Sequence, residues 1–144
     1  MDDIKSKPGL LNRFKSAPPE VRDYFAHLPK LVEEFPLDVA LGYMFSRVEI
    51  AQNMALYCGL VKLHRVDGPV AWSAIEAYHM TRRDFREKCS VVFGKPIADS
   101  VVTTLGRAED VRDRVMHGKH AEDSRKRNAV ANVLEYAERL NDHI

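Results

Sequence analysis

The sequence predicts an all-α fold, an antiparallel bundle of four main helices plus an N-terminal helix. Apolar residues recur at helical spacing through most of the chain, and no alternating strand pattern of useful length interrupts them. The chain has 144 residues, of which 45% are hydrophobic and 30% are charged, as a soluble domain with one core requires. We therefore expect residues 19–144 to form a single helical bundle domain.

The N-terminal segment differs from the rest of the chain in composition. Residues 1–18 carry several lysines, arginines and prolines and little periodic apolar content, which predicts a flexible, basic arm that is mobile or loosely docked. Pro19 suits the start of a helix. Apolar residues then recur at helical spacing up to Phe35, and Pro29 is expected to kink or divide this segment.

A long central helix is predicted over residues 37–64, and the turn residues 67–69 end it. Its apolar residues step by four and three, as in a seam packed against another helix: Leu37, Leu41, Met44, Val48, Ala51, Ala55 and Cys58. A second apolar stripe is expected to widen the buried arc: Ile50, Met54, Tyr57 and Val61. A polar stripe also follows this helix: Gly42, Ser46, Glu49 and Asn53.

Three further helical regions follow the central helix. The first runs over residues 70–93, with a break near Met80 and a capping box that starts at Thr81. Asp99 or Ser100 is expected to cap the next helix, which should stop at Gly118. The last begins near residue 123 or 124 and continues towards the end of the sequence.

Arg112 interrupts the apolar face of the helix that ends at Gly118. On a helical wheel it lies near the middle of that face, among Ala98, Val101, Leu105, Ala108, Val115 and Met116. A guanidinium keeps its proton, so burying it requires an acceptor: a carboxylate, a carbonyl or a ligand phosphate. Arg112 can reach the bundle edge or pair with Glu109, and Glu49 and Asn53 are the other groups suited to hold it.

His117 follows Arg112 by five positions and directly precedes Gly118, on the last helical turn or in the loop beyond it. A histidine at such a place is ordinarily a surface residue or a C-terminal cap. Together with an arginine, however, it suits work on a phosphodiester. The fixed cation neutralises phosphate charge, and a histidine side chain can move protons near neutral pH.

The six residues Arg112-Asp113-Arg114-Val115-Met116-His117 resemble the Arg-x4-6-His signature of the HEPN superfamily, the higher eukaryotes and prokaryotes nucleotide-binding domains. By helix order and spacing, the resemblance extends roughly over residues 37–143. Many members are metal-independent endoribonucleases that act as homodimers, with the two motifs facing each other. The resemblance implies that Arg112 stabilises the scissile phosphate, that His117 is the base or acid, and that Asp113 orients or polarises the site.

The same resemblance implies the products and leaves one alternative open. The RNA 2′-hydroxyl would attack its own phosphodiester and leave a 2′,3′-cyclic phosphate, and DNA would be inert because it lacks this nucleophile. Other members of the superfamily have lost catalysis. The alternative is therefore a non-catalytic helical interaction or regulatory module that binds a partner protein, such as an antitoxin, in a toxin–antitoxin or defence system.

Basic residues cluster around the motif, and four of them are candidate RNA contacts: Arg114, Lys119, His120 and Arg125. Such a run is also typical of a solvated helix end. With 22 basic and 21 acidic residues, the formal net charge is only +1, so any RNA affinity must come from a local patch. We expect a selective or weak RNA site and not a general nucleic-acid coat.

Other classes of site lack support in the sequence. There is no P-loop, dinucleotide-binding or nucleophile-elbow pattern, and we expect no cofactor. Glu76 and His79 form a single Glu-x-x-His pair, whereas a di-iron centre needs two, so no metal is expected. Cys58 and Cys89 lie among apolar residues and are expected to be free. The sequence has no secretory signal or membrane span, which predicts a cytoplasmic protein without a membrane partner.

Overall fold

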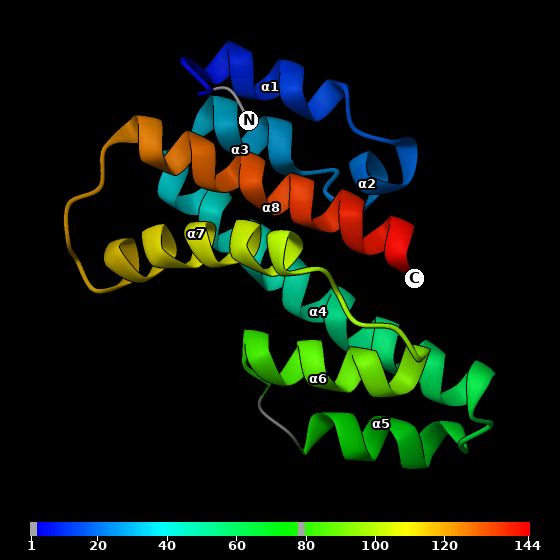
Figure 1. The fold of residues 1–144 in the computed structure, drawn as a ribbon. Coiled ribbons are helices and arrows are strands. Elements are labelled where there is room, and N and C mark those ends of the chain that lie inside the picture. The colour runs from blue at the N-terminus through cyan, green and yellow to red at the C-terminus, as the bar shows by residue number, and fades with distance from the viewer. Residues whose placement is uncertain (1–2, 78–79) are drawn as a thin grey trace.

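The computed structural model describes residues 3–77 and 80–144, and these form eight helices with no strand among them (Figure 1). The all-α prediction is confirmed. The helices are α1 Lys7–Lys15, α2 Pro19–Tyr24, α3 Leu28–Glu34, α4 Leu37–Leu63, α5 Gly68–Glu76, α6 Arg82–Phe93, α7 Asp99–Met116 and α8 Asp123–His143.

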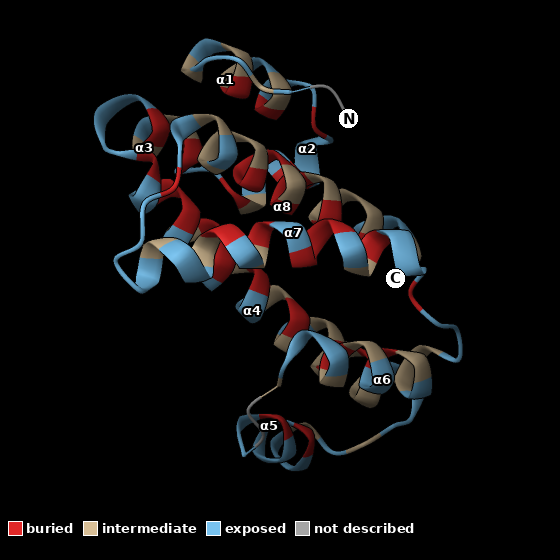
Figure 2. Cartoon of the chain, turned by 60° about the vertical axis from the view of Figure 1, so that its left-hand side comes forward, coloured by how far each residue is buried: buried red, intermediate tan, exposed pale blue. Residues whose placement is uncertain are grey.

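The five helices from α4 to α8 alternate in direction (Figure 1), and α3 packs against α4 and α1. Helix α8 packs against α7, α4 and α1, and buried residues follow the facing sides of α7 and α8 (Figure 2). Helix α5 packs against α4, and α6 packs against both α4 and α7. In the part of the chain that is described, none of these helices is long and apolar enough to cross a membrane.

The predicted start of α6 and end of α7 are found, but Ala98 is the N-cap of α7, in place of the expected Asp99 or Ser100. The Thr81 hydroxyl accepts a hydrogen bond from the Asp84 backbone N–H at 3.2 Å, and the Asp84 carboxylate accepts one from the Thr81 N–H at 3.1 Å, which completes the capping box. Helix α7 ends one residue before His117, and Gly118 follows with a φ of 69°, a left-handed conformation that favours glycine. Tyr78 and His79, next to the predicted break, lie outside the described residues.

The N-terminal segment differs from the expected loosely docked arm. Within residues 1–18 the chain forms α1, whose Leu10 and Phe14 are buried in the common core. Pro8 favoured the prediction of a loop, because a proline inside a helix breaks it. It lies in the first turn of α1, however, where a proline removes an N–H that has no helical partner.

The exposed side of α4 is also wider than expected. Leu37, Leu41 and Met44 are buried as predicted, but Ile50 and Met54 are 45% and 44% exposed. Met54 lines an apolar groove of about 370 Å³ between α2, α4 and α8. The second apolar stripe therefore does not extend the buried arc at these two positions.

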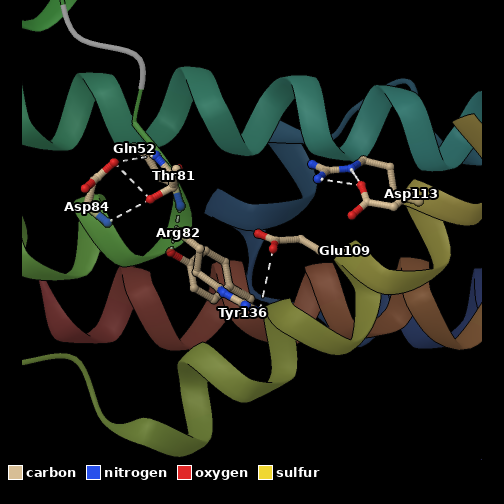
Figure 3. A network of polar contacts seen from close by, with 8 residues as sticks. Gln52, Thr81, Arg82, Asp84, Glu109, Asp113 and Tyr136 are labelled. Atoms are coloured by element: carbon tan, nitrogen blue, oxygen red, sulfur yellow. Dashed lines mark hydrogen bonds and ion pairs between the residues drawn. The ribbon is translucent and has the colours of Figure 1, made fainter.

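Gln52 and Tyr136 form a buried polar pair between α4 and α8 (Figure 3). The Gln52 Nε2 donates to the Tyr136 hydroxyl at 2.9 Å, and the two residues are 8% and 2% exposed. We expect Tyr136→Phe to lower the free energy of unfolding by about 1–3 kcal/mol, because the Gln52 amide loses its partner. Urea unfolding measures this, and Gln52→Leu in the same chain should recover part of the loss. An unchanged midpoint for Tyr136→Phe would contradict the pairing.

The same pair predicts a dependence on alkaline pH. Burial raises the pKa of Tyr136 above its ordinary value of 10.0, while the hydrogen bond from Gln52 opposes the shift. In the unfolded chain Tyr136 ionises near its ordinary pKa, whereas in the fold its raised pKa keeps the hydroxyl neutral to a higher pH. Its contribution is therefore complete below pH 10.0 and is lost as the pH rises above that value. The stability of Tyr136→Phe should fall less steeply in that range than that of the parent.

Candidate functional site

Arg112 lies in the last turns of α7 and faces α4. Its Cζ is 4.5 Å from the centre of the Phe45 ring, within the range of a cation–π contact. Its Nε and Nη2 donate to Oδ1 of Asp113 at 3.1 and 3.0 Å. The Arg112 side chain is 25% exposed and that of Asp113 is 56% exposed. The arginine is thus half-buried, and its acceptor is the carboxylate of its neighbour in sequence.

The two residues of α4 expected to hold Arg112 do not bond to it. Within residues 3–77 and 80–144, the hydrogen bonds of Arg112 go to Asp113, and none joins it to Glu49 or Asn53. Glu49 is exposed and lies one helical turn beyond Phe45, the residue that Arg112 covers. Asp113 is the acceptor for Arg112 in their place, because its carboxylate reaches the guanidinium from the same helix.

Arg82 and Glu109 form a second polar pair, which helical periodicity does not predict. Nη1 of Arg82, from the start of α6, is 3.6 Å from Oε2 of Glu109 on α7. Figure 3 shows Glu109 between Arg82 and Asp113, on the side of α7 that faces α4. Burial raises the pKa of the Glu109 carboxyl, and Arg82 and then Arg112 oppose this rise. Two guanidinium groups thus act on one half-buried carboxylate.

Gly106 was the sequence signal for this pair. A glycine inside a helix costs about 1 kcal/mol relative to alanine, so its presence in α7 calls for a reason. A Cβ atom at Gly106 would overlap Nη1 of Arg82. The absent side chain is what allows the Arg82 guanidinium to lie across α7 and approach Glu109.

Two glycine substitutions test this account. We expect Gly42→Ala to raise the free energy of unfolding by about 1 kcal/mol, because the new methyl group meets nothing within 4 Å on α4. We expect Gly106→Ala to leave it nearly unchanged, because displacing Arg82 from Glu109 offsets the gain in helix propensity. Urea unfolding compares the two, and NMR titration should show the pKa of Glu109 rising further in Gly106→Ala alone. Equal stabilisation by both, with no change at Glu109, would contradict the role of Gly106.

His117 caps the C-terminal end of α7 and is exposed. Among the residues that the structure describes, its side chain makes no hydrogen bond. The structure thus places His117 five positions after Arg112, at the helix cap, and in the part of the chain that it describes no hydrogen bond joins the two side chains.

The loop after His117 is held by Arg114. Its Nε and Nη2 donate to the backbone carbonyl of His120 at 3.2 and 2.9 Å, and the Lys119 N–H donates to the carbonyl of Arg114 at 2.8 Å. Of the four candidate RNA contacts, Arg114 thus serves the loop itself. Lys119 and His120 are exposed in the loop, and Arg125 is exposed in the first turn of α8.

The described ranges 3–77 and 80–144 hold no group of three or more His, Cys, Asp and Glu side chains placed to bind a metal ion. His79 of the Glu-x-x-His pair falls outside them. Cys58 and Cys89 are free thiols. Comparison of the chain with models of protein families, with curated proteins and with solved structures finds no match in any of the three.

Proposed function

We propose that this protein is a metal-independent endoribonuclease of the HEPN type that acts as a homodimer. The observation that carries the proposal is the Arg112–Asp113 pair near the end of α7, followed by the exposed His117 at the helix cap. The pair holds a guanidinium in one orientation, which suits a group that must receive a phosphate. The imidazole is accessible to a strand of RNA.

In the proposed reaction the RNA 2′-oxygen attacks the adjacent phosphorus, and the bond from phosphorus to the 5′-oxygen breaks. His117 takes the proton of the 2′-hydroxyl or delivers a proton to the leaving 5′-oxygen, and water makes the other proton transfer. Arg112 neutralises the charge that builds up on the phosphoryl oxygens. The products carry a 2′,3′-cyclic phosphate and a 5′-hydroxyl.

An exposed apolar side chain beside Arg112 and His117 supports a site formed by two copies of the chain. Met116, between them, is 74% exposed although it is apolar. Burying such a side chain against a second copy is favourable.

The RNA strand would follow the exposed basic residues beside the motif, Lys119, His120 and Arg125. Each phosphate neutralised by a basic side chain releases counterions, so binding should weaken with salt. We place the activity in the cytoplasm, where RNA substrates are present and where free thiols such as Cys58 and Cys89 persist.

The test is cleavage of a mixed RNA pool by purified protein in excess EDTA. We expect cutting that resists the chelator, with product ends that carry a cyclic phosphate. A DNA pool and a 2′-O-methyl RNA pool of the same sequences are the matched controls and should stay intact, because neither has the nucleophile. Cutting of the DNA pool, or no cutting of RNA by clean protein, would contradict the proposal.

A second candidate function is a non-catalytic interaction module, such as the partner-binding component of a toxin–antitoxin or defence system. The apolar groove of about 370 Å³ between α2, α4 and α8 favours it, because an exposed apolar surface is typical of a binding site. Intact RNA in the cleavage test, together with co-purification of a protein whose binding is lost on Met54→Asp, would support this second function.

A further inference from the structure

A polar pocket of about 260 Å³ lies between α7 and α8, away from the face on which Arg112 sits. From α7 it is lined by Arg107, Asp110 and Val111, and from α8 by Arg125, Ala129 and Asn132, among others. These residues are far apart in sequence, and the antiparallel packing of the two helices brings them together (Figure 1).

Two arginines of this pocket differ from the paired arginines elsewhere in the fold. In the part of the chain that is described, Arg107 and Arg125 make no hydrogen bond or ion pair. By contrast, Arg13 pairs with Glu138 at 2.8 Å, and Arg127 donates to a backbone carbonyl at 2.9 Å. Two unpaired guanidinium groups in one concavity are available to an anion, and they suit a phosphate because each can donate two parallel hydrogen bonds.

The remaining lining suits a planar polar ring. Asn132 is half-buried and, among the described residues, has no hydrogen-bond partner, so its amide offers both donors and an acceptor. The Asp110 carboxylate beside it adds acceptors. Val111 and Ala129 are buried and give the pocket an apolar floor. An anion next to a flat ring with polar edges is the chemistry of a nucleotide.

We propose that this pocket is a subsite for one nucleotide of single-stranded RNA. Its phosphate binds Arg107 and Arg125, and the edge of its base bonds to Asn132. This inference rests on the proposed ribonuclease function, which it deepens. Arg107 and Arg114 are seven positions apart on one face of α7, about 10 Å along the axis. The subsite thus continues the basic surface from the His117 end of the helix and holds a nucleotide of the strand that is bound there.

The first experiment measures binding of a fluorescent single-stranded oligoribonucleotide by anisotropy, in EDTA, with His117→Ala in every chain to prevent cutting. Adding Arg107→Ala should weaken binding on the order of tenfold and reduce the slope of log affinity against log salt by about 0.7, as for one lost phosphate contact. Adding Asn132→Ala should weaken binding severalfold without changing the slope. Arg22→Ala, an exposed arginine on α2, is the matched control and should change neither.

The second experiment identifies the ligand chemistry by NMR. Cytidine 5′-monophosphate should shift the side-chain amide resonances of Asn132, and inorganic phosphate at the same concentration should not. Equal shifts with both probes would reduce the pocket to an anion site and overturn the proposal. Equal oligoribonucleotide affinities for the Arg107→Ala and Arg22→Ala chains would overturn it as well.

The outcomes separate this subsite from the proposed reaction. If the parent chain cleaves RNA but the Arg107→Ala and Asn132→Ala changes leave the affinity unchanged, the ribonuclease proposal stands and the subsite proposal fails. Binding that depends on both residues, without cleavage by the parent chain, would retain the subsite and remove the ribonuclease. Absence of both would remove both.

Discussion

Replacing His117 with alanine is expected to reduce RNA cleavage by about 10²–10⁴-fold, the usual contribution of a general acid or base. Its side chain is exposed and makes no hydrogen bond among the described residues, so the substitution removes the proton carrier and little else. The free energy of unfolding should stay within about 0.5 kcal/mol of the parent. Initial rates on the RNA pool and a urea unfolding curve on the same preparation measure the two effects.

The matched control is His27→Ala, which removes another exposed imidazole at the start of α3, outside α7 and its loop. This variant should cut RNA at the parent rate. Cleavage that persists in His117→Ala would remove the histidine from the reaction. A large loss of stability in His117→Ala would make it a structural residue and contradict the role given to it.

Arg112→Ala is expected to lower RNA cleavage by about 10²–10³-fold, as the loss of one group that stabilises transition-state charge typically does. Its effect on stability should be small, about 1 kcal/mol or less, because water can reach the 56% exposed Asp113 that it leaves behind. A fully buried arginine would instead have left an unpaired buried partner. Cleavage rates and urea unfolding again measure the two effects.

Arg112→Lys keeps the positive charge but lacks the planar set of guanidinium donors. It should restore only part of the cleavage rate that Arg112→Ala loses. Mixing Arg112→Ala with His117→Ala tests the two-copy site, because each variant supplies the group that the other lacks. Recovery of cutting in the mixture would support a site shared between copies. Parent-like rates for Arg112→Ala alone would exclude the arginine from the reaction.

Local signals explain which parts of the fold could be predicted. The start of α4 follows from Pro36 before it, and the starts of α5 and α6 follow from Pro69 in the first turn of α5 and from the capping box at Thr81. These features act within a few residues of the chain, so a sequence contains all that they need. Helix α1 was not predicted, because its stability comes from the packing of Leu10 and Phe14 into a core formed mainly by other helices.

The contacts of the candidate site likewise fall into two groups: those within one helix, which a sequence can predict, and those between helices, which it cannot. Arg112 and Asp113 are neighbours in sequence, and their hydrogen bonds form within one helix. Arg82 is 27 positions from Glu109 and meets it only because α6 packs beside α7. The pocket that joins Arg107 to Asn132 likewise exists only between two packed helices.

The sequence by itself determined the all-α class, most helix boundaries and the Arg-x4-His motif at the end of a helix, because helical periodicity, capping and turn chemistry are local. Only the tertiary structure decided how deeply Arg112 is buried and which acceptor it uses. It also placed Arg82 on the carboxylate of Glu109 and left Ile50 and Met54 uncovered. These outcomes depend on which helices lie side by side and how closely they approach, and that is set by the packing of the whole core.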